Sequence, residues 1–248
     1  MVTLDALPTN RDEEWRYADP AAIAGLDADA LALWRDVTLA PGETRTKDLV
    51  LGEGEAGLHR VRLTVGAGAR AALFAILSAS EYTRLEVEVT LGEGAHFELG
   101  GVTIGGGDAV REIVTRVHHA QPHATSNQVV RSVHWGTATG NFLGRLAVAR
   151  DAQKTDAAQS FKGLLLERGA STNARPELEI FADDVKCAHG AAIGRLDETA
   201  AFYMAARGLP PEAAKALLVR AFVADAFAAH GEPEALLDAA LGALEGAA

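Results

Sequence analysis

The residues best suited to chemistry are the only cysteine of the chain, Cys187, and a histidine two positions later, His189. If this segment is extended, alternate side chains point to one side of the strand, so the thiol and the imidazole share a face. A thiolate beside an imidazole can bind iron, zinc or copper, although two ligands do not complete a tetrahedral site. The alternative is a small buried thiol and a histidine that is satisfied by hydrogen bonds.

Two further groups of residues could do chemistry, and a simpler interpretation is favoured for both. His118, His119 and His123 suggest a metal cluster, but adjacent strand residues point to opposite faces. At most one of the first two therefore faces the side of His123, and we expect histidines that are hydrogen-bonded in a turn. Asp183 and Asp184 could be a general acid and base, but neighbouring side chains diverge here too, which favours a solvated turn.

Motifs of nucleotide hydrolysis and of nucleophilic or zinc-dependent catalysis are absent from the sequence. The glycine run 105–107 lacks the Gly-Lys-Ser/Thr ending of a phosphate-binding loop, so it is predicted to be a turn. No Gly-x-Ser-x-Gly, His-Glu-x-x-His or Cys-x-x-Cys motif occurs. Any ATP hydrolysis must therefore come from another subunit.

The elements that must position the candidate pair are short strands, which the sequence predicts from about residue 37 to residue 196. Apolar and polar residues alternate over 61–65, 85–91 and 113–117, which is the pattern of strands with one buried face. No helix-length pattern interrupts this region. Parallel strands normally need a crossover helix, and stacked coils of strands and turns avoid that need by winding the chain.

A weak internal repeat supports the stacked coils. Gly66 and Gly92 each begin a Gly-x-Gly turn after a strand, and they lie 26 residues apart. Gly52 begins a poorer third copy. Repeated turns at such a spacing are typical of coils that cannot bury their own face alone, although a β-sandwich is the alternative.

Helices are predicted at both ends of the chain. Residues 9–35 form a polar helical arm, with Trp15 and Tyr17 as anchors on the body and a second short helix over 27–35. The pattern divides the chain into this N-terminal helical arm (1–36), a strand core (37–196) and a C-terminal helical domain (197–248).

Three short amphipathic helices are predicted in the C-terminal domain. Asp197 is placed to cap the first, which Gly208 would stop, and prolines at 210–211 and at 233 open the other two. Apolar stripes at helical spacing could be buried against each other or could bind a partner. The stripe of the middle helix is Leu217, Leu218, Ala221, Phe222 and Asp225, and that of the last helix is Leu237, Ala240, Leu241 and Leu244.

Composition limits the compartment and the partners. The net charge of −11 argues against nonspecific binding to nucleic acid, which needs a basic surface. A single cysteine cannot form an internal disulfide, which suits a reducing cytosol. The sequence shows no signal peptide and no apolar run of about 18 residues, so we expect a cytoplasmic protein without membrane contact.

Nearly continuous segments of the chain match a known family. These segments are Asp12–Tyr17, His118–Ala120, Gly144–Arg145, Ala152–Ala157, Asn173–Ile180, Ala182–Ala191, Gly194–Asp197 and Phe202–Tyr203. On them the chain resembles the SufB/SufD family of iron–sulfur cluster assembly proteins, and it looks most like the SufD members. The resemblance is strong over residues 118–230.

The resemblance implies a right-handed parallel β-helix with helical ends and the role of a non-catalytic scaffold subunit in iron–sulfur cluster assembly. The ends of the β-helix would pair edge to edge with the paralogue SufB, with a homodimer possible when the chain is alone. The C-terminal helices would bind the ATPase SufC. The residues implied in that contact are Phe202, Tyr203, Leu218 and Phe222.

His189 matches the functional histidine of the family at the interface between SufB and SufD, and Cys187 matches a neighbouring cysteine. The resemblance therefore implies that these residues help to bind a transient iron–sulfur cluster or iron that is shared with the partner subunit. No cofactor is expected to be bound tightly by this chain alone. The chain departs from the family in being short, so several N-terminal coils are expected to be missing, and in lacking the cysteine that SufB brings.

Two other functions stay open on the sequence. A β-helix enzyme that acts on polysaccharide could use Asp183 and Asp184, although aromatic residues make up only 6% of the chain and no export signal is present. A structural adaptor without metal would bind partners independently of His189. Iron and sulfide analysis of the co-expressed complex would separate these functions from the scaffold.

Overall fold

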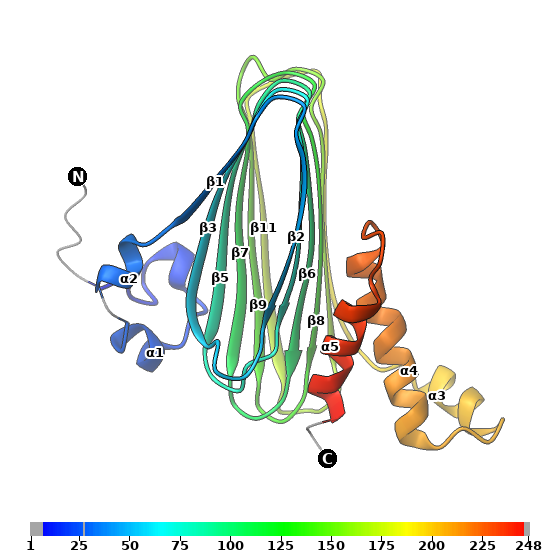
Figure 1. Cartoon of the computed structure of the whole chain (residues 1–248). Coiled ribbons are helices and arrows are strands. Elements are labelled where there is room, and N and C mark those ends of the chain that lie inside the picture. Colours follow the sequence, from blue (N-terminus) through cyan, green and yellow to red (C-terminus); the bar gives the residue numbers. More distant parts are fainter. Residues whose placement is uncertain (1–6, 27, 246–248) are drawn as a thin grey trace.

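The fold is built from two parallel sheets that one chain winds together. The structure is a computed structural model that describes residues 7–26 and 28–245 (Figure 1). Its strands are β1 (Arg35–Leu39), β2 (Thr44–Leu51), β3 (Gly57–Val65), β4 (Arg70–Leu77), β5 (Thr83–Leu91), β6 (His96–Gly105), β7 (Val110–His119), β8 (Thr125–His134), β9 (Thr139–Val148), β10 (Asp156–Leu165), β11 (Ser171–Ile180) and β12 (Lys186–Arg195). One sheet has the order β1-β3-β5-β7-β9-β11 and the other has the order β12-β10-β8-β6-β4-β2.

The described part is thus a mainly β solenoid of about six turns. Stacked coils are confirmed, and the β-sandwich is wrong.

Each coil contributes one strand to each sheet, so parallel neighbours need no crossover helix. Val65 lies opposite Leu91 in the register, and the N–H of Gly92 donates to the carbonyl oxygen of Val65 at 2.9 Å. Gly66 and Gly92 therefore occupy equivalent turns, as predicted. A Cβ atom on Gly66 would lie 2.7 Å from the carbonyl oxygen of Leu39, so the stacking of the first two coils requires a glycine there.

The third copy predicted at Gly52 is wrong as a repeat. Gly52 lies in the turn between β2 and β3, at the opposite corner of the coil from Gly66. The turn equivalent to Gly66 is 40–43, because the N–H of Gly66 donates to the carbonyl oxygen of Leu39 at 3.0 Å. Tight turns at both corners favour glycine, so the motif alone does not tell one corner from the other.

The interior of the solenoid changes character along its axis. The early coils are filled by apolar side chains such as Leu85, Val87 and Phe97, each fully buried. In β6 to β10 several buried positions are polar, and these are Thr103, Thr115, His119, Ser126, Gln128, Ser132, His134 and Gln159. Polar groups in an interior destabilise the fold unless they are hydrogen-bonded. Thr103 bonds to Ser132, His119 to Ser126 and His134 to the carbonyl oxygen of Gly105, whereas the side chains of Thr115, Gln128 and Gln159 have no partner among the described residues.

The N-terminal arm packs on the outer face of the sheet that contains β5. It contains η1 (Glu13–Trp15), α1 (Pro20–Ala24) and α2 (Ala28–Ala32). Trp15 is buried, and the guanidinium of Arg84 lies 3.9 Å above its ring while Nη2 of Arg84 donates to the carbonyl oxygen of Glu14 at 2.8 Å. Trp15 is therefore an anchor, as predicted.

The second predicted helix is wrong at its C-terminal end. The helix over 27–35 was expected to include Trp34 and Arg35, but α2 ends at Ala32, and Arg35 begins β1 in register with β3. Pairing with β3 overrides the local helical pattern there. Trp34 instead lies under the guanidinium groups of Arg60 and Arg62, at 4.0 and 4.4 Å. Residue 27, the predicted start, lies outside the described residues.

The C-terminal helices are α3 (Glu198–Ala205), α4 (Pro211–Ala224), η2 (Asp225–Phe227) and α5 (Glu234–Glu245). Oδ1 of Asp197 accepts from the backbone N–H groups of Thr199 and Ala200 at 2.9 and 3.2 Å, which confirms the predicted cap. Figure 1 shows α4 and α5 along the outer face of the sheet that contains β6 and β8, with α3 further from the solenoid. In the described part of the chain no helix is both long enough and apolar enough to cross a membrane.

The predicted stripe of α4 is only partly correct. Val219 and Val223 are fully buried against the outer face of the sheet, whereas Leu217 is exposed and Leu218 and Phe222 are half-buried. The docked face is thus rotated from the predicted one, because the sheet selects the side with branched residues that fit its surface. For α5 the predicted stripe is confirmed, since all four of its residues belong to the packed cluster.

Candidate functional site at the open end of the solenoid

The candidate pair lies on an edge strand. β12 pairs with β10 and is the last strand of its sheet, and β11 pairs with β9 and is the last strand of the other. We refer to β11 and β12 as the last coil. Its two outer edges carry backbone N–H and C=O groups that no further strand of the described chain pairs, which makes them a surface for another strand.

Cys187 and His189 face the interior side of this open end. In the register Cys187 lies opposite Ala157 and His189 opposite Gln159. Ala157 and Gln159 are buried inside the solenoid, and side chains of paired residues point to the same face. The thiol and the imidazole therefore share a face, as the alternation predicts.

The environments of the two side chains differ. Cys187 is half-buried and packs against the cluster that contains Leu146, Val148 and Ala157. Burial raises the pKa of its thiol, and the negative charge of Asp156 raises it further, so the thiol form is favoured at neutral pH. His189 is exposed and has no hydrogen-bond or ion-pair partner among the residues that the structure describes. Its imidazole is thus available to a ligand from outside.

Polar side chains continue inward from His189. Gln159 and then Gln128 occupy the same row across the sheet, and both are buried with carboxamide groups that make no hydrogen bond. In the opposite sheet the hydroxyl of Thr115 is also buried and unpartnered, and it lies in register with Gly144. A Cβ on Gly144 would lie 2.9 Å from Nε2 of Gln159, so Gly144 leaves space for that side chain.

The alternation of apolar and polar residues does not by itself reveal this polar row. The available signal was the amide residue at each of two interior positions of otherwise one-sided strands. Buried amides without partners cost about 1–3 kcal/mol per group, so they are not there for stability. They place donors and acceptors directly behind His189.

The described residues contain no group of three or more His, Cys, Asp or Glu side chains arranged to hold a metal ion. The pair at the open end is therefore an incomplete donor set. A metal ion or cluster bound at His189 would need further ligands from a second molecule, and the free strand edges are where such a molecule would approach.

The other candidates do not converge on a site. His118 is exposed and His119 is fully buried on β7, and Nε2 of His119 lies 2.9 Å from Oγ of Ser126. The expectation of turn histidines is thus wrong for these two, because pairing of β7 extends to His119; only His123 lies in a turn, with φ of 60°.

The aspartates and the glycine run behave as predicted. Asp183 and Asp184 lie exposed in the turn between β11 and β12, and Asp184 forms an ion pair with Lys154. A solvated turn is therefore confirmed. Residues 106–109 form the turn between β6 and β7, which confirms the prediction for the glycine run.

The predicted partner-binding residues fall into two groups. Leu218 and Phe222 line a groove of about 350 Å³ between α4 and the end of β12, together with Ile193. Phe202 and Tyr203 do not line it; they are 75% and 57% exposed on α3.

The last coil and the turn after β11 also expose apolar side chains that the sequence pattern does not distinguish from buried ones. Ile180, Phe181 and Ile193 are each at least 38% exposed. Alternation predicts which face of a strand is apolar, but it does not indicate that a coil is the last one and remains uncovered.

Comparison with known proteins places these features in a family. The family model described as "SUF system FeS cluster assembly, SufBD core domain" matches residues 50–222. The chain is 35% identical over 111 residues to the iron–sulfur cluster assembly protein SufD of Escherichia coli. The matched segment covers 45% of the chain and 26% of that protein. It is also 35% identical over 133 residues to the SufBD family protein slr0076 of Synechocystis. This match covers 54% of the chain and 29% of that protein.

A plant relative matches a shorter segment. The chain is 48% identical over 81 residues to Protein ABCI7, chloroplastic, of Arabidopsis thaliana, which covers 33% of the chain and 17% of that protein. The chain thus spans less than a third of the length of each of these relatives.

Proposed function

Because this chain belongs to the SufBD core family of the SUF system for iron–sulfur cluster assembly, we propose that it acts as a non-catalytic scaffold subunit of that system. In this proposal its last coil pairs with a SufB paralogue, its C-terminal helices bind the ATPase SufC, and His189 helps to hold iron or a nascent cluster. The cluster is cargo, held transiently between two subunits.

The observation that carries the proposal is the inner face of the open last coil, which has a single charged residue. Along β12 the inward positions are Cys187, His189, Ala191, Ile193 and, at the end of the strand, Arg195. Along β11 those from Thr172 to Ile180 are Thr, Ala, Pro, Leu and Ile. The charged residues of β11 alternate with them and point outward.

Inward-pointing charges are one of the features by which proteins protect a free strand edge from pairing. In the last coil only Arg195 stands in such a position, at the end of β12, so the rest of the edge is suited to pairing with another strand, in which main-chain hydrogen bonds supply affinity. The exposed Ile193 on β12 adds apolar area to the same end. In the absence of the paralogue, the same edges would pair two copies of this chain.

The role of His189 follows from its position on this edge. An unpartnered imidazole beside a free strand edge lies within reach of an adjoining subunit, and imidazole suits iron. The thiolate would come from the SufB side, because Cys187 is half-buried and its raised pKa favours the thiol. We therefore expect Cys187 to contribute less than His189.

The proposed SufC surface comprises α3 and the outward side of α4. Phe202, Tyr203 and Leu217 are large apolar side chains that are each at least 48% exposed there. Large exposed aromatic side chains are enriched in binding hot spots. Leu218 and Phe222 line the adjacent groove and would form the border of the proposed SufC surface.

The test is co-expression with the SufB and SufC proteins of the same source, followed by iron and sulfide analysis of the purified complex. His189→Ala is expected to leave the fold and the complex intact and to lower iron and sulfide severalfold, whereas Cys187→Ser should have a milder effect. His118→Ala is the matched control, because it removes an exposed imidazole from β7 rather than from the last coil.

Circular dichroism checks the fold of each variant. Wild-type iron and sulfide in the His189→Ala complex would refute the role of His189 but not the scaffold function. Failure to co-purify with either protein would refute the scaffold function itself.

A further inference from the structure

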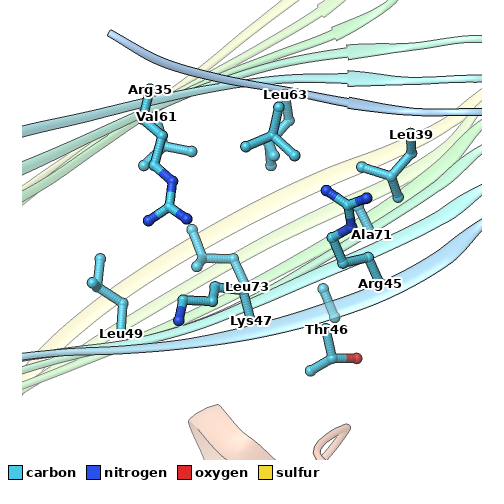
Figure 2. A pocket seen from close by; sticks show the side chains of 12 residues that line it. Arg35, Leu39, Arg45, Thr46, Lys47, Leu49, Val61, Leu63, Ala71 and Leu73 are labelled. Carbon is cyan, nitrogen blue, oxygen red and sulfur yellow. The ribbon is translucent and has the colours of Figure 1, made fainter. Parts of the chain in front are cut away.

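The opposite end of the solenoid, formed by β1 and β2, carries three cations on its interior side. We refer to these two strands as the first coil. In the register Arg35 lies opposite Val61, Arg45 opposite Ala71 and Lys47 opposite Leu73. The three partners belong to the apolar core of the next coil. Each cation therefore points to the interior side, where the equivalent residue of the next coil is apolar. Figure 2 shows them around the space between the two sheets.

These cations surround a cavity of about 130 Å³ with an apolar floor. The floor includes Leu39, Leu49, Leu63 and Leu73, and no acidic side chain lines the cavity. Arg35, Arg45 and Lys47 are exposed at the mouth, so a ligand that brings negative charge can reach them while its apolar part contacts the floor.

Only one of the three cations is neutralised by its surroundings. Arg45 lies 2.5 Å from Oε1 of Glu43, and the other carboxylate oxygen of Glu43 accepts from the N–H of Ala40 at 2.9 Å. Arg35 and Lys47 have no ion pair with any residue that the structure describes. The mouth of the cavity therefore has an excess of positive charge within a chain whose net charge is −11.

The outer edges of β1 and β2 are free, because β1 pairs with β3 alone and β2 with β4 alone among the described strands. A parallel strand added to each edge would continue the rows of the sheets. It would place one side chain over each inward residue. Carboxylates would lie over Arg35, Arg45 and Lys47, and apolar side chains would lie over positions such as Leu39 and Leu49.

We propose that the first coil binds an extended polypeptide segment. The inward-facing residues of this segment are acidic where they lie above the three cations and apolar where they lie above the leucines. The segment adds a strand to one or both sheets. The pattern above β2 is acid-x-acid-x-apolar-x-apolar, which follows from Arg45, Lys47, Leu49 and Leu51.

Neither a second copy of this chain nor an anionic lipid fits equally well. The first coil of another copy would bring the same three cations, and its last coil has no carboxylate on the inward positions from Cys187 to Ile193. A lipid headgroup could neutralise the cations, but it would leave the main-chain groups of two strand edges unpaired. A strand satisfies both the charges and the edges.

The experiment measures binding of a labelled synthetic peptide to the full chain by fluorescence anisotropy. The peptide has two strands joined by a copy of the turn Ala40–Glu43, with glutamate over each cation and leucine over each inward leucine. A second peptide has lysine in place of each glutamate. We expect saturable, salt-sensitive binding of the acidic peptide and binding of the lysine peptide that is weaker by at least about tenfold.

Variants locate the site. The triple variant R35Q/R45Q/K47Q should bind the acidic peptide about tenfold or more weakly, which corresponds to about 1.4 kcal/mol or more. The matched control R62Q/R145Q/K162Q removes the same number of charges from exposed positions outside the cavity and should bind as the wild type does. If the triple variant does not fold, the single variant K47Q replaces it, because Lys47 is exposed at the mouth.

Three results would overturn the proposal: no saturable binding of the acidic peptide at millimolar concentration, equal affinity for the lysine peptide, or unchanged affinity in the folded variant. Sedimentation of the variants adds one more outcome. If R35Q/R45Q/K47Q self-associates while its affinity for the peptide is unchanged, the cations only protect the edge from aggregation, and the proposal is wrong.

Discussion

Acidification is expected to destabilise the solenoid through two buried histidines, His119 and His134. Both are fully buried in the middle coils. Burial lowers the pKa of His119 to about 4. Burial also lowers the pKa of His134 to about 3, and the positive charge of Arg111 adds to this effect. Nδ1 of His134 lies 3.0 Å from the carbonyl oxygen of Gly105, so in the neutral ring the proton is on Nδ1, which donates to that oxygen.

The sign and the size of the effect follow from linkage. Above a pH of about 6.5, the ordinary pKa of histidine, both residues are neutral in the folded and in the unfolded chain, and their contribution to stability is fully present. As the pH falls below that value, the two histidines bind protons in the unfolded chain but not in the folded chain. The unfolding free energy therefore decreases until the pH reaches the pKa of each histidine in the folded chain. At about pH 5 each histidine costs about 2 kcal/mol of unfolding free energy. The sum is a large fraction of the roughly 5–15 kcal/mol that stabilises a typical domain.

The assay is urea unfolding followed by circular dichroism at about pH 8 and about pH 5, for the wild type and for H119Q and H134Q. Glutamine keeps hydrogen-bonding capacity but does not titrate, so each variant should lose about 2 kcal/mol less than the wild type between the two pH values. H118Q is the control, because His118 is exposed on the neighbouring position of β7. Carboxylates titrate equally in all four proteins and cancel in the comparison. If H119Q and H134Q lose as much stability as the wild type, the two histidines are not the source of the acid sensitivity.

Two further predictions concern the arm and the helices. The guanidinium of Arg84 is fully buried between carboxylates of Glu86 and Glu112, at 2.7 and 2.9 Å, so Arg84→Met should cost about 3–5 kcal/mol in urea unfolding and expose the arm to protease. Arg62→Met, at an exposed ion pair, should cost less than about 1 kcal/mol, and equal losses would show that the buried network is not what holds the arm. Under the proposed docking, Phe202→Asp should abolish SufC pull-down without loss of stability, whereas Phe222→Asp should also destabilise the helices against the sheet, because Phe222 is half-buried there. Unchanged pull-down by both variants would place the docking surface elsewhere.

Local features of the fold were predictable from the sequence because they depend on near neighbours. Alternation of apolar and polar residues predicts strands, and the close approach of successive coils explains the glycine at Gly66. The cap at Asp197 and the shared face of Cys187 and His189 depend only on residues two or three positions apart. The similarity to SufD predicted the solenoid and its family, which the match over residues 50–222 supports.

Features that depend on residues far apart in the chain were decided by the tertiary structure. Alternation does not state which coils are the first and the last, so the free edges at Arg35 and at His189 became visible only once the sheet order was known. The buried face of α4 was decided by the sheet against which it packs, which selected Val219 over Leu217. Similarly, Gln128 and Gln159 form one row with His189 only through a register that joins residues about 30 positions apart. Period-two alternation shows that such side chains share a face within a strand, whereas stacking of coils decides which of them meet, because contact across strands is set by register and not by sequence distance.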